Sequence, residues 1–231
     1  MSKARRRIAA IPTDSTEESM MKTWKRTVAA TAAIVLIATA SACSRQEATE
    51  SGAKLASSFG ALIDEQLSNG TLSEFETDVL TRARERGTIS QADYESAHDR
   101  YRECMARSGV DADERRFPNG VIHATPGLPS AEFTVERLGD IDYACSIGTL
   151  VVIDELFVVQ QGNPDLLSDL EAAGAACLVR EGLAPEGFGH DDFAASFGEG
   201  KTDFSSLPFD VRDARAQMCL FVAHQTITFA D

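Results

Sequence analysis

Two stretches of sequence decide the fold of this chain: Cys104-Met105-Ala106-Arg107-Ser108-Gly109-Val110 and its near copy Cys177-Leu178-Val179-Arg180-Glu181-Gly182-Leu183. In both copies the residues before the cysteine follow helical periodicity, and the glycine is the residue type that most often ends a helix. Each copy is followed by a loop, a Phe-x-Val segment at Phe133 or Phe209, a second helical pattern and a second cysteine. The sequence therefore predicts two copies of one unit, in which a helix ending at Cys-x-x-Arg-x-Gly pairs with a helix that carries the second cysteine.

The two copies also predict which cysteines are bridged. Cys104 and Cys145 lie 41 residues apart, and Cys177 and Cys219 lie 42 residues apart. Four cysteines allow three pairings, and the duplication favours Cys104–Cys145 with Cys177–Cys219, because a unit that once folded alone would close its own bridge. The chain has no Cys-x-x-Cys and no cysteine pair with zinc spacing, so we expect stapling bridges, no metal and no cofactor.

Helix-start signals recur along the chain. Ser73 with Glu76 and Ser90 with Asp93 each have capping-box spacing. Residues 110–130 predict a loop, with room for a short hairpin at Asn119-Gly120. We therefore expect a mainly α fold: a disulfide-stapled helical domain built from two repeated helix–loop–helix units, with irregular loops and little or no strand.

The most apolar part of the chain predicts the centre of the fold. A long helix is expected from about 134 to 161, and it should be the most buried one because its second half is apolar on most faces. Segments 150–153 and 156–159 are rich in β-branched residues, so strand is the alternative there. Asp165 is expected to cap the following helix, and Asp210 with Asp213 to open the last one.

These patterns divide the chain into five parts. They are a signal segment at 1–42, whose translation start we place at Met20 or Met21, a lipidated cysteine with a flexible tether at 43–54, an N-terminal helical hairpin at 55–90, a first cysteine unit at 91–162 and a second at 163–231.

The segment that ends at Cys43 has the order typical of a bacterial lipoprotein signal. Lys22, Lys25 and Arg26 precede an apolar stretch at 28–39, and small residues separate that stretch from Cys43. The apolar stretch is shorter than the ~20 residues that a membrane-spanning helix needs. The order predicts lipidation at Cys43 and a location on the outer face of the cell membrane; the alternative is an uncleaved membrane anchor with a free Cys43.

The part from Cys43 onward is strongly acidic. The chain has 22 basic residues (Lys and Arg) and 36 acidic ones (Asp and Glu), of which seven basic and three acidic residues lie before Cys43. The remainder therefore carries 15 basic and 33 acidic residues, a net charge of −18. Such a surface repels phosphate backbones and anionic headgroups, which excludes nucleic acid as a partner and leaves the lipid anchor as the contact with the membrane.

A resemblance to a family rests on four short motifs. Tyr101-Arg102-Glu103-Cys104-Met105, the preceding Asp93-Tyr94-Glu95, Asn163-Pro164, and Cys177-Leu178 with Gly182 are similar to a group of uncharacterised secreted lipoproteins of high-GC Gram-positive bacteria, with a duplicated Cys-[Met/Leu]-x-x-x-Gly helix motif. The match covers about residues 70–222. It implies the same location and disulfides, and it carries no assigned activity.

Residues with catalytic or metal-binding chemistry form no recognised motif. The chain has no His-Glu-x-x-His and no Gly-x-Ser-x-Gly, so catalytic residues are unknown. His98 is expected at the surface or half-buried on its helix. His190-Asp191-Asp192 is interpreted as a helix start, with cation binding as the alternative.

Phenylalanines gather in the irregular segment 183–208, where they usually pin a loop onto a core. The alternative is an apolar binding surface for a partner or ligand. Its candidate residues are Phe188, Phe193, Phe197 and Phe204.

Taken together, the sequence predicts a lipid-anchored extracytoplasmic protein with a non-catalytic binding or interaction role toward an unknown protein or cell-envelope ligand. The alternative is an extracytoplasmic hydrolase that acts on cell-envelope material through carboxylates that the sequence does not identify.

Overall fold

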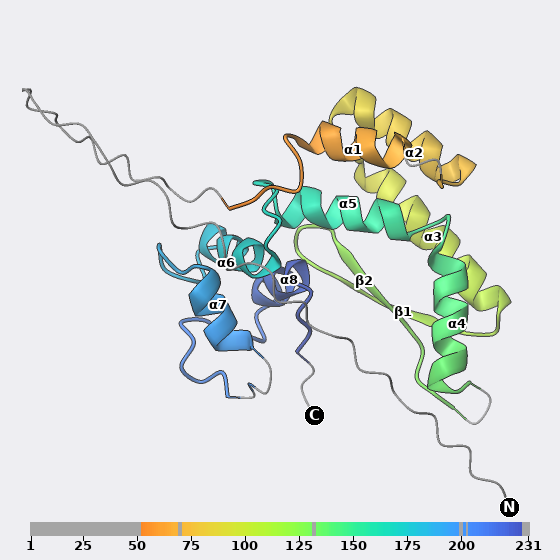
Figure 1. Ribbon diagram of the computed structural model, residues 1–231. Helices are drawn as coiled ribbons and strands as arrows, with labels where there is room; N and C mark the ends of the chain where they lie inside the picture. The colour runs from red at the N-terminus through yellow and green to blue at the C-terminus, as the bar shows by residue number, and fades with distance from the viewer. Residues whose placement is uncertain (1–51, 69–70, 131–132, 199–200, 202, 228–231) are drawn as a thin grey trace, which may run out of the picture. The chain divides into compact units, whose positions relative to one another are not determined.

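Helices make up most of the structure, a computed structural model that describes residues 52–68, 71–130, 133–198, 201 and 203–227. Within these residues there are eight α-helices and one two-stranded antiparallel sheet (Figure 1). Cys43 and the predicted signal lie outside the described residues. The expected mainly helical fold is confirmed. None of the helices in the described part has the length and hydropathy that crossing a membrane requires.

The first three helices are α1 (Phe59–Ser68), α2 (Glu74–Arg86) and α3 (Gln91–Arg107). The second and third of these form where the capping signals at Ser73 and Ser90 predict them. Ser73 and Glu76 make the reciprocal capping box that starts α2. Gly87 ends this helix with φ +78°, a left-handed conformation that glycine adopts without steric cost. The Gly–Thr–x–Ser corner between α2 and α3 therefore follows from local sequence alone.

The last predicted tether residue is held by the fold. Lys54 pairs with Leu167 in an isolated antiparallel bridge, and its ammonium donates to the carbonyl of Asp165 at 2.9 Å. The Leu55 amide donates to the Leu166 carbonyl at 2.8 Å. The tether predicted for 43–54 is thus too long at its C-terminal end, because backbone hydrogen bonds fix Lys54.

The predicted hairpin is present. β1 (Ala112–Arg116) pairs with β2 (Ile122–Pro126), in a register that places Arg116 opposite Ile122. Gly120 takes φ +88° in the connecting turn, and its amide donates to the Phe117 carbonyl at 3.0 Å. This hairpin is the only sheet in the described residues, so the expectation of little strand also holds.

The predicted long helix is wrong, because two helices occupy its place. α4 (Val135–Ser146) and α5 (Val151–Gly162) are separated by a break at 147–150. Gly148 has φ +74°, and the Ser73 hydroxyl donates to its carbonyl at 2.7 Å. The left-handed glycine ends the helical path, and the distant serine satisfies the carbonyl that the break exposes.

α5 nevertheless occupies the centre of the fold, as expected of the most apolar segment. It contacts α1, α2, α3, α6 and α8, and Ile153 and Phe157 are fully buried. Of the two segments for which strand was the alternative, 151–153 and 156–159 are helical, and Leu150 is the N-cap of α5. In Figure 1, α5 runs between the α1–α2 hairpin above and the β-hairpin below.

The C-terminal part contains α6 (Leu170–Arg180), α7 (His190–Phe197) and α8 (Ala214–Val222). The predicted cap at Asp165 is wrong, since Asp169 accepts the Ala172 amide and starts α6. Leu166 has φ +55°, and the Asn163 side chain binds both the amide and the carbonyl of Leu167 at 3.0 and 2.8 Å. This local loop delays the helix. α8 likewise starts after Asp213, while Asp210 caps only a preceding turn.

Both predicted disulfides are present. Cys104–Cys145 joins α3 to α4, with 5.5 Å between the Cα atoms, and Cys177–Cys219 joins α6 to α8, with 5.4 Å. The loops that they close do not overlap in sequence. Each bridge therefore ties together one helix pair.

The two repeated helix ends have the same geometry. Gly109 and Gly182 take φ +77° and +69°. The Val110 amide donates to the Met105 carbonyl at 3.0 Å, as the Leu183 amide does to the Leu178 carbonyl at 3.0 Å. The paired helices differ in their starts: α4 begins two residues after Phe133, whereas α8 begins five residues after Phe209.

Candidate functional site

We call one exposed surface the α4 face: Val135, Gly139 and Tyr143 on the outward side of α4, with Ile147 directly after the helix ends at Ser146. Steps of four residues place the three helical positions on one side of α4. The side chains of Val135, Tyr143 and Ile147 are 72%, 69% and 52% exposed. A Cβ atom added to Gly139 would meet nothing within 4 Å, so the middle of this face is open.

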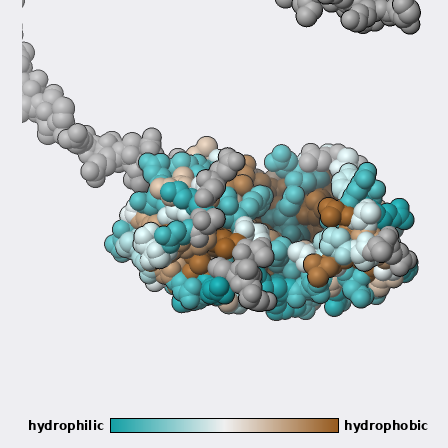
Figure 2. All heavy atoms as spheres, turned by 90° about the horizontal axis from the view of Figure 1, so that it is seen from below, coloured by the Kyte–Doolittle hydropathy of each residue, from teal (hydrophilic) through white to brown (hydrophobic). Residues whose placement is uncertain are grey.

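The α4 face stands out against the rest of the described surface. Among the described residues, six large apolar side chains are exposed. Four of these six belong to the short segment 128–147: Leu128, Val135, Tyr143 and Ile147. Leu128 is 89% exposed in the loop that leads into α4. Scattered single apolar residues need no explanation, whereas a cluster is typical of an interaction site. On the side of the protein shown in Figure 2, apolar patches interrupt a mostly hydrophilic surface.

The opposite side of α4 is firmly attached to the core. Leu138, Ile141 and Cys145 are buried, and the disulfide connects α4 to α3. The Tyr101 phenol donates to Asp142 Oδ1 at 2.5 Å. Burial first, and this carboxylate second, raise the pKa of Tyr101, so the phenol remains a donor. These contacts fix the α4 face in place before any partner arrives.

Acidic residues surround the α4 face. Glu136, Asp140 and Asp142 lie on α4 between the apolar positions. The one basic residue of α4, Arg137, lies about 160° around the helix from Gly139, at 100° per residue. The local field at this face is therefore negative.

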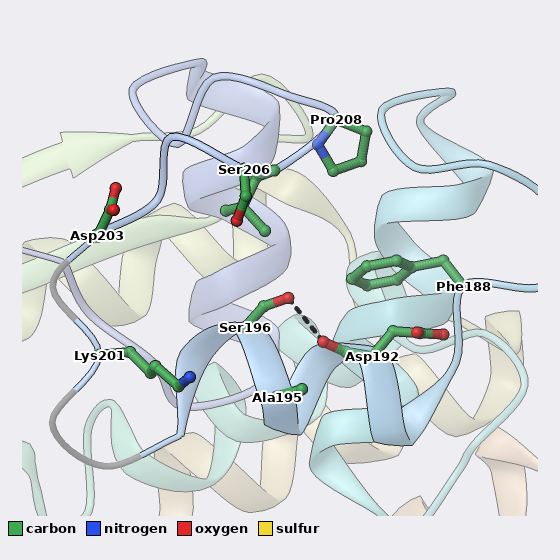
Figure 3. Close-up of a pocket in the computed structure, with 9 residues that line it drawn as sticks. Phe188, Asp192, Ala195, Ser196, Lys201, Asp203, Ser206 and Pro208 are labelled. Carbon is green, nitrogen blue, oxygen red and sulfur yellow. Dashed lines mark hydrogen bonds between the residues drawn. The ribbon is translucent and has the colours of Figure 1, made fainter.

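A pocket of about 320 Å³ opens beside α7 (Figure 3). Its lining mixes four apolar with five polar or charged residues: Phe188, Asp192, Ala195, Ser196, Lys201, Asp203, Ser206, Leu207 and Pro208. In Figure 3 the carboxylates of Asp192 and Asp203 lie at opposite ends, and Ser196 donates to the Asp192 carbonyl at 2.7 Å. The Asp203 carboxylate accepts the Ser205 amide at 3.0 Å, which lowers its pKa. The polar groups are thus mostly engaged with their own backbone.

The predicted phenylalanine surface is only partly accessible. Phe193 is fully buried and Phe197 is 8% exposed, so neither side chain can face a partner. The reason is Gly174 in α6, where a Cβ atom would lie 2.7 Å from the Phe193 ring. Phe204 packs on Phe197 with ring centroids 5.8 Å apart, and Phe188 alone of the four lines the pocket.

A buried polar cluster that the sequence did not predict surrounds His98. This residue is 1% exposed, which corrects the expectation of a surface or half-buried position. His98 Nδ1 lies 3.0 Å from Glu114 Oε1, and Nε2 lies 3.5 Å from Asp154 Oδ1 without a hydrogen bond. Tyr94 donates to Asp154 at 2.7 Å, and burial above all raises the pKa of its phenol. The cluster connects α3 and α5 to β1, so its evident role is to hold the hairpin.

Two other histidines lie at the start of α7 and in β2. His190 begins α7 as predicted, and Asp192 accepts the Gly189 amide at 3.0 Å. The hydrogen bond with Asp191 and the nearby Asp169 raise the pKa of His190. Burial first, and then Arg115, lower the pKa of His123. In the described ranges, no three His, Cys, Asp or Glu side chains converge as metal ligands would.

Comparison with family models, curated proteins and solved structures finds no match to this chain.

Proposed function

We propose that this chain is a lipid-anchored protein on the outer face of the cell membrane that binds another macromolecule through the α4 face and does not catalyse a reaction. The observation that carries the binding role is the clustering of exposed apolar side chains at Val135 and Tyr143 on one rigidly held helix and at Ile147 directly after it. Binding of a partner over apolar surface of this kind is favourable, because it removes that surface from water.

The location rests on the basic–apolar–small–Cys order that ends at Cys43, and two observations support it. The bridges Cys104–Cys145 and Cys177–Cys219 suit an oxidising compartment, where disulfides persist. The resemblance to secreted lipoproteins of high-GC Gram-positive bacteria agrees with that location.

We further propose that the two cysteine units, 91–162 and 163–231, arose by duplication. The support is local: both bridges have nearly equal sequence separations of 41 and 42, and both start at a helix that ends in a left-handed glycine, Gly109 or Gly182. In each case the second cysteine belongs to a helix that packs on the first. The different starts of α4 and α8 are ascribed to divergence of the intervening loops.

Metabolic labelling with a clickable palmitate analogue tests the location. The wild-type chain should take up the label in an exporting Gram-positive host, and Cys43→Ser should not. Protease added to intact cells should then remove the labelled wild-type protein, whereas a protected protein would place it on the wrong side of the membrane.

A second assay separates binding from catalysis. The full chain is incubated with purified cell wall, and soluble sugar and peptide fragments are measured. We expect no release above that of the heat-denatured protein. Release by the native chain would overturn the non-catalytic role in favour of the hydrolase alternative.

A further inference from the structure

We propose that the partner of the α4 face is a polypeptide segment that is both basic and aromatic. This inference rests on the proposed function and on the duplication that relates α4 to α8. It goes further by naming the chemistry of the partner. That chemistry is inferred from the side chains that contact α8 in the second unit of this chain.

The duplication equates residues of the two helices through their cysteines. Aligning Cys145 with Cys219 places Tyr143 opposite Gln217 and Ile147 opposite Phe221. Two of the four positions of the α4 face therefore have counterparts on α8, whereas Val135 and Gly139 align with Phe209 and Asp213, which precede this helix.

The counterparts on α8 contact the β-hairpin. Arg115 of β1 donates to Gln217 Oε1 at 3.4 Å. The Phe221 ring lies 5.5 Å from the Phe117 ring and 4.8 Å from the His123 ring, measured between centroids. A guanidinium and aromatic rings thus contact, in the second unit, the two positions that correspond to the exposed Tyr143 and Ile147.

The side chains of the α4 face suit the same covering groups. The Tyr143 ring can accept a guanidinium over its face, and such cation–π contacts favour Arg. Ile147 offers an apolar surface to an aromatic ring, as Phe221 does on α8. Glu136 and Asp140 lie beside these positions and attract positive charge.

Charge disfavours two other occupants. In an antiparallel pair of α4 helices related by a two-fold axis at Gly139, Val135 would meet Tyr143 of the second copy, but Glu136 would also meet Asp142 of the second copy. Like charges placed opposite each other are destabilising. An anionic lipid surface is repelled by the same carboxylates and by the net charge of −18 from Cys43 onward.

The test uses ¹⁹F NMR on the full chain labelled with 3-fluorotyrosine. The sequence has three tyrosines; Tyr94 and Tyr101 are buried, and Tyr143 is 69% exposed, so the three signals report on separate environments. The probes are three pools of short peptides with the same Phe and Leu content, in which the other positions are Arg and Lys, Glu and Asp, or Ser and Gln.

We expect the basic pool alone to shift the Tyr143 signal in a saturable manner. Two variants, Tyr143→Ser and Ile147→Asp, should each weaken binding about tenfold, because each loses one cation–π or apolar anchor. Binding to Tyr143→Ser, which lacks the labelled tyrosine, is followed through a fluorescent basic peptide. The matched control is Leu170→Asp, which changes another exposed leucine, 38% exposed, at the start of α6. It should bind like the wild type, and circular dichroism checks that each variant is folded.

Other outcomes would overturn the inference. Equal binding of the acidic pool, a response of Tyr94 or Tyr101 without Tyr143, or equal loss in the Leu170→Asp variant would each contradict it. A concentration-dependent dimer that Ile147→Asp abolishes would show that the α4 face binds a second copy of the chain. Binding to anionic vesicles would show that it binds a lipid surface. Failure here leaves palmitate labelling at Cys43 unaffected, so it is distinguishable from failure of the proposed location.

Discussion

The phenol of Tyr94 donates a hydrogen bond to Asp154 Oδ1 at 2.7 Å, and this contact joins the middle of α3 to α5. The phenol oxygen of Tyr94 in turn accepts a hydrogen bond from the Ile122 amide of β2 at 3.0 Å. The Tyr94 ring also stacks on Phe157, with 3.9 Å between centroids. The Tyr94 side chain thus joins two helices to the hairpin. By fixing the hairpin, it also positions the hairpin side chains that contact α8.

Tyr94→Phe should lower the free energy of unfolding by about 1–3 kcal/mol, because the buried Ile122 amide loses its acceptor and Asp154 loses a donor. The ring stack on Phe157 remains, which isolates the effect of the hydroxyl. Urea denaturation measures the change. The matched control is Tyr143→Phe on the exposed α4 face, where a change below about 0.5 kcal/mol is expected. Equal effects at the two positions would contradict the assigned role of Tyr94.

Removal of the first bridge by Cys104→Ser with Cys145→Ser should cost ~2–5 kcal/mol and leave Cys177–Cys219 formed. Because α4 is exposed on one side, it should lose amide protection more than α5 does. Hydrogen exchange with mass spectrometry on the variant measures this difference. The reciprocal double variant at Cys177 and Cys219 is the control and should affect α6 and α8 instead. Uniform loss of protection in both variants would show that the bridges do not act locally.

Two glycine-to-alanine changes should have opposite signs. In α6, a Cβ atom at Gly174 would lie 2.7 Å from both Ala223 and Phe193, so Gly174→Ala should destabilise by about 1–3 kcal/mol through overpacking. In α4, Gly139→Ala meets nothing within 4 Å and should stabilise by about 0.5–1 kcal/mol through helix propensity. Thermal denaturation of the two variants measures both. A stabilised Gly174→Ala would mean that α6 and α7 can separate at little cost.

Asp93 should make stability depend on pH in the acid range. Burial alone would raise the pKa of this carboxyl, but hydrogen bonds from Arg82, Ser90 and Arg86 outweigh burial and lower the pKa. In the acid range the unfolded chain then binds more protons than the folded one. The stability that Asp93 contributes is therefore fully present above its pKa in the unfolded chain, about 4, and is lost as the pH falls through its pKa in the folded chain.

Asp93→Asn tests this linkage. The variant should be less stable at neutral pH by about 1 kcal/mol, because the arginines are half exposed. It should also lose less stability than the wild type on acidification below about pH 4. Urea denaturation along a pH series measures the two slopes, and parallel slopes would contradict the pKa direction.

Signals that act within a few residues were predictable from the sequence. Helix ends at Gly87 and Gly109 depend on a local left-handed conformation, which glycine identity alone indicates. The bridges followed from the repeat around Cys104 and Cys177. Asn119-Gly120 indicated the hairpin for the same local reason.

Features that depend on distant residues were not predictable. Gly148 breaks the expected long helix, and the Ser73 hydroxyl that satisfies its carbonyl is far away in sequence. His98 is buried because Glu114 and Asp154 meet it from other elements. The α4 face also escaped prediction, since periodicity marks Tyr143 and Ile147 as apolar without showing that no other element covers them.

The placement of the two disulfides has a consequence for how the chain can be cut. The disulfides close two rings, 104–145 and 177–219, which are joined by one open connection at 146–176. A single peptide bond cleaved inside a ring leaves every atom linked, so a nicked α4 would stay tethered to α3. A single cleavage in the open connection divides the molecule into two pieces, each with its own ring intact.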